Sequence, residues 1–297
     1  MTFPHRVEQW RQAGAYAEVG GHRLFFREEG AGDEAIVCFH GFPTSCFDWL
    51  PIWDQLTECY RVLTWDLLGF GFSDKPAPHH YMITEQTDLL LELLAQRGID
   101  RAHILSHDYG TILVQELMAR AGDGDSVPGL KMDSVTFLNG GLFPEMHRPR
   151  LTQRLLLSPL GWLVSRLFTE KKFASAFSEV FGADTKPSEE EIKEFWSLIE
   201  FNDGARVNHL LINYMRERLQ FRDRWVHGMI DSPIPTILIN GLDDPVSGAH
   251  LLARARDQMT KAHFVALPGI GHYPQVEAPE AVLDAFLAFI EPLGPSL

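Results

Sequence analysis

Short apolar runs alternate with longer helical patterns along this chain. Most runs are apolar at consecutive positions, which is typical of strands buried on both faces of a parallel sheet. We expect eight strands, at residues 15–19, 24–27, 36–40, 61–65, 102–106, 134–138, 236–240 and 263–267. We expect helices at residues 83–97, 111–121, 251–259 and 279–290. This alternation predicts an α/β fold whose mostly parallel sheet carries helices on both faces. The first two strands are too close for a crossover helix and should pair antiparallel.

The segment 141–230 departs from this alternation because it holds no convincing strand. Phe, Leu, Arg and Glu recur there at helical spacing, punctuated by prolines. We interpret it as a helical cap inserted between the sixth and seventh strands, which leaves residues 1–140 and 231–297 as the core. Alternatively, these residues form extra helices packed directly on the sheet. Four aromatic residues could line an apolar pocket or simply form helix cores: Phe168, Phe173, Phe177 and Trp196.

Composition narrows the protein class. Of 297 residues, 45% are hydrophobic and 22% charged, a globular balance that excludes a disordered chain or a fibre. No apolar run reaches the ~18 residues that a membrane span needs, and the first residues lack the apolar core of a secretory signal. The formal net charge of −14 disfavours nucleic acid and anionic membrane as partners. The three cysteines, Cys38, Cys46 and Cys59, include no Cys-x-x-Cys pair, so we expect reduced thiols and a cytoplasmic location. We also expect a monomer or homodimer.

The most informative stretch is AHILSHDYG, residues 102–110, which passes from a strand into a helix. A sharp strand-to-helix turn raises one side chain above the sheet edge and requires small residues two positions before and after it. With Asp108 at the centre, these neighbours are Ser106 and Gly110, which fit. Asp108 is therefore the candidate nucleophile, although an aspartate here could also serve only as a helix N-cap.

Two later loops offer partners for Asp108. His272 follows the last expected strand between small residues, which makes it a candidate base. Asp243 and Asp244 follow the seventh strand, and either carboxylate could orient the imidazole. Nucleophile, acid and histidine thus come in the chain order of one known type of catalytic triad.

A further loop, His40-Gly41-Phe42-Pro43, follows the third strand. The backbone N–H of Phe42 can join that of Tyr109 as an oxyanion hole, whereas the alternative is a plain Gly–Pro turn. The histidines are scattered, without an i, i+4 pair flanking a Glu. The sequence therefore implies no metal, and we expect no cofactor.

These motifs resemble the aspartate-nucleophile branch of the α/β-hydrolases, which includes epoxide hydrolases and haloalkane dehalogenases. Within this branch, the chain is most similar to the mesoderm-specific transcript proteins and their bacterial relatives. The resemblance implies a triad of Asp108, His272 and Asp244, with Asp243 as second choice because the family's acid directly precedes a proline or similar turn residue. The motifs span nearly the whole core and the entry to the cap: HGFPTS (40–45), DLLGFGFSDKP (66–76), LSHDYG (105–110), NGGLFPEMHRP (139–149) and GHYPQVEAP (271–279).

The resemblance implies a hydrolase that uses water and acts on a small apolar organic substrate. In this branch a carboxylate displaces a leaving group from alkyl carbon, and the resulting ester is hydrolysed by water that the histidine activates. An epoxide hydrolase that forms a vicinal diol is the leading interpretation. The alternatives are a haloalkane or haloacid dehalogenase, an ester or lactone hydrolase, and a binding protein on a hydrolase scaffold.

The chain departs from both enzyme patterns in its cap. Many epoxide hydrolases carry two cap tyrosines, whereas residues 141–230 contain only Tyr214. The stretch 212–216 resembles the helix that bears the second tyrosine, with Tyr214 one residue out of register. We expect Tyr214 to donate a proton to the epoxide oxygen, with His147 or His209 as its partner. Alternatively, Tyr214 is a packing residue and His147 is solvated.

The positions around the nucleophile also differ from those of dehalogenases. Haloalkane dehalogenases typically have Trp after the nucleophile, where this chain has Tyr109, and Asn139 stands where some of them keep the acid. An amide cannot stabilise an imidazolium by charge, so the later loop is the better source of the acid. The residues that we expect to contact substrate are His40, Phe42, Tyr109, His147 and Tyr214.

Overall fold

The computed structural model of the chain describes residues 2–122 and 129–293. An eight-stranded sheet runs through its centre in the order β1-β2-β4-β3-β5-β6-β7-β8. Strand β2 pairs antiparallel with β1 and β4, and the other strands pair parallel. The predicted sheet is therefore confirmed. The strands are β1 (Ala15–Val19), β2 (His22–Glu29), β3 (Ala35–Phe39), β4 (Arg61–Trp65), β5 (Arg101–Ser106), β6 (Lys131–Phe137), β7 (Thr236–Gly241) and β8 (His263–Leu267).

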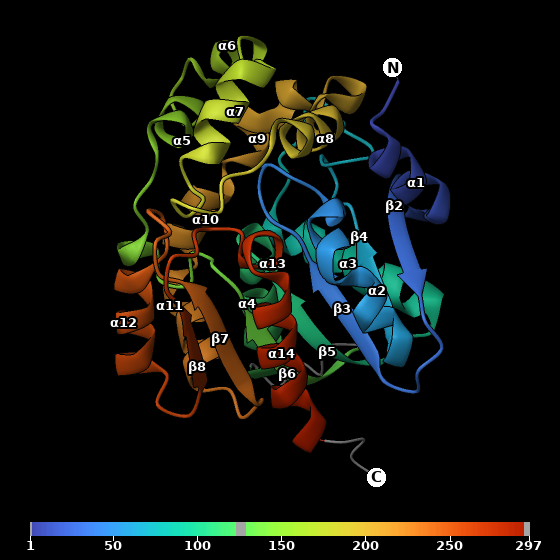
Figure 1. Cartoon of the computed structure of the whole chain (residues 1–297), viewed down its shortest axis with the longest axis vertical. Helices are drawn as coiled ribbons and strands as arrows, with labels where there is room; N and C mark the ends of the chain where they lie inside the picture. The colour runs from blue at the N-terminus through green and yellow to red at the C-terminus, as the bar shows by residue number, and fades with distance from the viewer. Residues whose placement is uncertain (1, 123–128, 294–297) are drawn as a thin grey trace.

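Helices cover both faces of this sheet (Figure 1). Successive residues of a buried strand enter different cores, because side chains alternate across the sheet. In β3, Val37 and Phe39 pack in the core that contains α3 and α4, whereas Ile36 and Cys38 pack in the core that contains α2 and α14. The core helices are α1 (His5–Ala13), α2 (Leu50–Cys59), α3 (Ile83–Arg97), α4 (Tyr109–Gly122), α12 (Ala249–Gln258), α13 (Pro274–Glu277) and α14 (Pro279–Ile290).

A second group of helices lies between β6 and β7. Most of them stand above one end of the sheet, at the top of Figure 1. The last one, α11, instead packs on α4: Trp225 Nε1 donates to Glu116 at 2.6 Å, and Gly228 lies against Ala119. The end of the segment 141–230 thus packs against a helix of the core. The helices are α5 (Leu151–Leu156), α6 (Gly161–Arg166), α7 (Glu170–Ser178), α8 (Glu189–Glu200), α9 (Asn208–Leu211), α10 (Tyr214–Gln220) and α11 (Arg222–Ile230).

The three cysteines are free. Cys38 and Cys46 are buried, and burial raises the pKa of the Cys38 thiol. Cys59 is exposed at the end of α2. In the part of the chain that the structure describes, no helix has both the length and the apolar character required to cross a bilayer.

Candidate active site

The turn between β5 and α4 raises Asp108 above the edge of the sheet. Its φ of 42° lies in the left-handed region, which aspartate tolerates better than most residues. A side chain at Gly110 would bring its Cβ within 2.6 Å of Phe39 Cβ, so the turn needs glycine there. Ser106 is buried and donates to the Thr136 carbonyl at 2.9 Å. The two small neighbours of Asp108 are therefore required by close packing.

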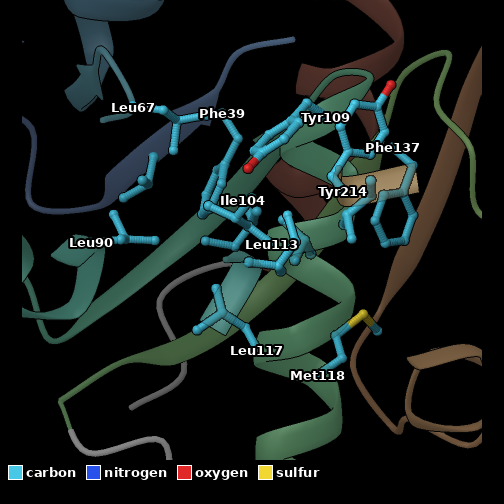
Figure 2. Packing of buried hydrophobic residues seen from close by; sticks show 14 of the residues in the cluster. Phe39, Leu67, Leu90, Ile104, Tyr109, Leu113, Leu117, Met118, Phe137 and Tyr214 are labelled. Carbon is cyan, nitrogen blue, oxygen red and sulfur yellow. The ribbon is translucent and has the colours of Figure 1, made fainter. Parts of the chain in front are cut away.

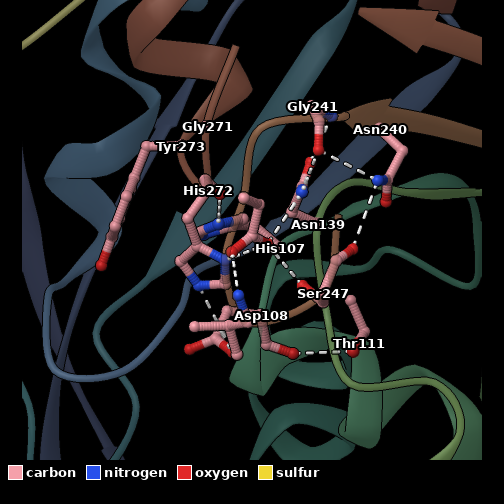
Figure 3. Close-up of polar contacts among 12 residues, drawn as sticks. His107, Asp108, Thr111, Asn139, Asn240, Gly241, Ser247, Gly271, His272 and Tyr273 are labelled. Carbon is pink, nitrogen blue, oxygen red and sulfur yellow. Dashed lines mark hydrogen bonds and ion pairs between the residues drawn. The ribbon is translucent and has the colours of Figure 1, made fainter. Parts of the chain in front are cut away.

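The structure brings Asp108, His272 and Asp244 together. His272 Nδ1 donates to Asp244 Oδ2 at 2.7 Å, and its Nε2 lies 3.7 Å from Asp108 Oδ1 (Figure 3). All three side chains are buried. One imidazole thus spans the two carboxylates.

Asp244 is held by four donors. Besides His272, the Ser247 hydroxyl donates to Oδ2 at 2.6 Å, the Val246 N–H donates to Oδ1 at 2.7 Å, and Asn139 Nδ2 donates to Oδ2 at 2.9 Å. The neighbouring Asp243 accepts only a long bond, 3.3 Å, from the exposed Gly269 N–H. Of the two candidate acids, Asp244 is thus the one that forms a hydrogen bond with His272.

Asn139 has a positioning role that its amide alone did not suggest. Its Oδ1 accepts from the Gly241 N–H at 2.7 Å, and its Nδ2 donates to the Gly241 carbonyl at 2.9 Å as well as to Asp244. Its backbone carbonyl accepts from the Asp108 N–H at 2.9 Å. Asn139 therefore ties the elbow to the loop that carries the acid.

The electrostatics of the triad favour a charged imidazole at rest. Burial opposes this charge, but Asp244 and Asp108 raise the pKa of His272 well above its usual value. Burial likewise opposes ionisation of Asp108, yet the adjacent His272 holds its pKa below the ordinary value. Because an ester on Asp108 would carry no charge, its formation would lower the pKa of His272 and favour the neutral base.

The loop after β3 supplies the expected backbone donor. The Phe42 N–H donates to Asp108 Oδ2 at 3.0 Å. The chain passes very close to the elbow, because a Cβ on Gly41 would lie 2.9 Å from Asp108 Cβ. Tyr109 opens α4 directly after Asp108, so its N–H begins that helix.

Two of the expected substrate contacts lie elsewhere. His40 is fully buried, with Nδ1 donating to the Gly41 carbonyl at 2.9 Å and Nε2 accepting from the Leu67 N–H at 3.0 Å. Both ring nitrogens thus form hydrogen bonds with backbone groups. His40 does not line the cavity that lies over the triad. The Tyr109 ring packs in the core beside Tyr214, at a centroid distance of 4.9 Å (Figure 2). Its side chain does not line the cavity either.

A cavity of about 530 Å³ lies over the triad, between the core and the cap. Asp108, His272 and Phe42 form part of its wall. The cap side is mainly apolar, and Trp196 lies behind it, with its ring 5.8 Å from that of Phe168. The apolar residues that the cap contributes to the wall include Leu151, Leu155, Leu156, Val164, Leu167, Phe168, Phe173, Phe177 and Val180.

The cap also places unpaired polar atoms near Asp108. The Tyr214 hydroxyl and both ring nitrogens of His147 are buried and lack a hydrogen-bond partner within the described chain. Burial and the neighbouring Arg218 cation lower the pKa of His147 to about 4, against the opposing effects of Asp108 and Gln153. Burial and the charge of Asp108 raise the pKa of Tyr214. Neither of these two residues lines the large cavity, but Gln153, which does, lies beside both. The ring nitrogen Nδ1 of His209, the other expected donor, is bonded to the Arg206 carbonyl.

Arg218 is a buried cation that the sequence did not single out. One guanidinium nitrogen donates to the Gly141 carbonyl, and Nε has no partner among the described residues. Burial lowers the pKa of Arg218, while Tyr214 and Asp108 oppose that shift. A Cβ on Gly141 would overlap an Arg218 guanidinium nitrogen, so a side chain there would displace the guanidinium. No recognisable motif flanks this arginine on its cap helix, so the sequence alone could not identify Arg218 as part of the site.

Only one group of side chains in the described chain has a spacing suited to a metal ion. His22, His79 and Glu85 bring one ligand atom each within 4.8 Å of one another. His79 Nε2 already pairs with Glu85 at 2.8 Å, and none of the three lines the cavity. The triad itself therefore has no metal ligand set around it.

The chain is similar to known proteins over most of its length. Residues 36–285 match a family model described as "Alpha/beta hydrolase family". The human Mesoderm-specific transcript homolog protein is 40% identical, covering 96% of this chain and 88% of that protein. A Soluble epoxide hydrolase of Corynebacterium sp. is 26% identical, covering 93% and 96%. A solved haloalkane dehalogenase variant from Bradyrhizobium elkanii is similar in fold, with a TM-score of 0.78, 22% identity, and coverage of 94% and 96%.

Proposed function

This chain belongs to the alpha/beta hydrolase family, and we propose that it converts an apolar epoxide to a vicinal diol through an ester on Asp108. One observation carries this proposal: the side chain raised at the elbow is a carboxylate. Its Oδ2 accepts from the Phe42 N–H, and its Oδ1 faces His272 Nε2. A carboxylate so placed can attack alkyl carbon, where a serine would attack acyl carbon.

In the first step, an oxygen of Asp108 forms a bond to a ring carbon of the epoxide as that carbon's bond to the ring oxygen breaks. The oxygen leaves with the electron pair and takes the proton of the Tyr214 hydroxyl. Burial and the charge of Asp108 raise the pKa of Tyr214, so this proton is present at neutral pH. The hydroxyl forms no hydrogen bond within the described chain, and Gln153, which lines the cavity, lies beside it.

In the second step, water attacks the carbonyl carbon of the ester and gives a proton to His272. Asp244 holds the resulting imidazolium through Nδ1. The N–H groups of Phe42 and Tyr109 face the developing oxyanion. The proton that His272 loses once the ester has formed restores the Tyr214 hydroxyl through water before this step. The ester C–O bond then breaks, the diol oxygen takes the remaining proton of the attacking water, and the carboxylate of Asp108 is restored beside a protonated His272, as at rest.

A second candidate, carbon–halogen cleavage, is favoured by Arg218. A departing halide needs donors and positive charge, and the buried guanidinium lies near Asp108. Tyr109 stands where typical haloalkane dehalogenases have tryptophan, so carbon–halogen cleavage ranks below epoxide hydrolysis. Incubation with a panel of epoxides and haloalkanes separates the two, because one releases diol and the other releases free halide.

The decisive experiment follows the oxygen of water. With excess enzyme in ¹⁸O-water, one turnover should give unlabelled product and should label the peptide that contains Asp108. Over many turnovers, the label should reach product too, because the labelled carboxylate attacks the next substrate. Label in the product of the first turnover, with Asp108 unlabelled, would mean that water attacks substrate directly and would exclude the nucleophile. Substrate binding without any product would instead favour a binding protein.

A further inference from the structure

The cap exposes an apolar surface on α5, α6 and the loop between them. Six of the nine large hydrophobic residues that the described chain exposes lie within residues 151–167, with exposures from 39% to 71%. Scattered single hydrophobic residues are normal on a surface, but a contiguous group marks an interaction site. This cap face lies at the top of Figure 1, at the end of the molecule remote from the C-terminus. Its apolar members are Leu151, Leu155, Leu160, Trp162, Leu163 and Leu167.

The charge around this cap face is opposite to that of the whole protein. Residues 148–172 contain six basic residues and one acidic residue, in a chain of formal net charge −14. The Arg166 guanidinium lies over the Trp162 ring at 5.3 Å. The inference from net charge against anionic membranes therefore does not apply to this face. Five exposed basic residues of this stretch form no ion pair within the described chain: Arg148, Arg154, Arg166, Lys171 and Lys172.

The cavity connects this face to the triad. Leu151, Leu155 and Leu167 belong both to the exposed group and to the cavity wall, which also includes Asp108. Apolar molecules held at this face would thus meet a continuous apolar path to the nucleophile.

We propose that this face of the cap docks on the surface of an anionic lipid bilayer. Trp162 and the leucines enter the headgroup region, where tryptophan is favoured, and the surrounding basic side chains meet lipid phosphates. A two-fold dimer through the same face would bring the six basic residues of each copy together and would cover the cavity. Charge complementarity thus favours lipid over a second copy. Docking does not depend on which reaction Asp108 performs.

The test measures sedimentation of the purified protein with vesicles. We expect binding to vesicles of phosphatidylcholine and phosphatidylglycerol, much weaker binding to phosphatidylcholine alone, and loss of binding at high salt. Leu160→Asp with Trp162→Ala should reduce partitioning at least about tenfold, because both side chains lose apolar contact with lipid. Arg166→Glu with Lys171→Glu should reduce it roughly 25-fold or more, since each basic residue contributes about fivefold near an anionic surface.

A matched control is available on the cap itself. Leu219 on α10 is 68% exposed but lies outside this face, so Leu219→Asp should bind vesicles like the unmodified protein. Circular dichroism and thermal unfolding of all variants check that the exposed substitutions leave the fold intact. Equal binding by all variants, no binding to anionic vesicles, or a concentration-dependent dimer abolished by Leu160→Asp would each overturn the proposal. The last outcome would identify a second copy as the occupant.

Discussion

The loop that holds the acid on the core side and the cap side of the active site differ in how their polar atoms are paired, although His107 Nδ1 on the core side is also buried without a partner in the described chain. On the core side, Asp244 accepts four hydrogen bonds, and Asn139 uses both its oxygen and its nitrogen. On the cap side, the Tyr214 hydroxyl, the His147 nitrogens and Arg218 Nε are buried without partners in the described chain. Buried polar groups are rarely left unpaired, because each costs about 1–3 kcal/mol.

This difference suggests a division of roles. The paired groups around Asp244 and Asn139 are preorganised whether or not a ligand is present, so they help to determine the type of reaction. The unpaired cap side gains its partners only when a substrate arrives, so it determines which leaving group is accepted. Substitutions on the two sides should therefore differ in their effects on activity and on stability.

The largest effect is expected on the core side, from His272→Gln. Turnover should fall by about 10³–10⁴-fold, because the base for ester hydrolysis is lost. The first step should continue, so intact mass spectrometry should show protein heavier by one substrate unit. An inactive variant that stays unmodified would contradict the two-step scheme.

On the cap side, Tyr214→Phe should slow formation of the ester by about 10²-fold or more, the usual scale for a positioned general acid. Stability should be retained, since the lost hydroxyl has no partner in the described chain. Single-turnover kinetics with an epoxide measures the first step. Tyr16→Phe, on the distant strand β1, serves as control. An unchanged rate would remove Tyr214 from the mechanism and favour a histidine donor or halide chemistry.

On the core side, Asn139→Ala should lower the stability of the fold, whereas Tyr214→Phe should not. Removal of the asparagine side chain leaves the buried Gly241 N–H unpaired and takes one donor from Asp244, so unfolding free energy should fall by roughly 2–3 kcal/mol. Urea denaturation, compared with Tyr214→Phe, measures the contrast. Similar losses for the two variants would show that the core and cap sides do not differ as proposed.

The smallest effect concerns pH and the first step. Between about pH 5 and 8, Asp108 stays ionised because its pKa is lowered, and His147, whose pKa is about 4, stays neutral. Ester formation should therefore vary less than about threefold. Ester hydrolysis should slow as pH falls, because Asp244 still raises the pKa of His272 and protonation removes the base. Stopped-flow and quench measurements separate the two steps; a steep pH dependence of ester formation would contradict these assignments.

Local patterns predicted most of the core. Strands β1, β4 and β8 begin and end where expected, because short apolar runs bounded by polar residues leave few alternatives. Helices α1 and α2 were not predicted, since each buries only two or three apolar residues. Strand β2 is longer than expected, because polar residues extend it at both ends: His22 and Arg23 pair with β1, and Glu28 and Glu29 pair with β4.

Within the site, the residues of the core could be predicted from the sequence, whereas most of those of the cap could not. Asp108, Asp244 and His272 stand at strand ends between recognisable neighbours, so their proximity could be predicted. The face of a cap helix that turns toward Asp108 depends on how several short helices pack, and spacing does not specify it. The ring of Tyr214 packs 6.1 Å from that of Phe42, a contact that the spacing along the chain did not specify. Gln153 and Arg218 were not expected at all.

The left-handed backbone at Asp108 also sets a limit for protein engineering. The strained elbow of hydrolases with a Gly-x-Ser-x-Gly motif carries serine, so serine would fit at this φ of 42°. Threonine or valine would be worse, because a branched Cβ crowds the backbone there. Directed evolution of this scaffold should thus find new substrates more readily through the cavity wall, at positions such as Leu155 and Phe168, than through a branched nucleophile such as threonine.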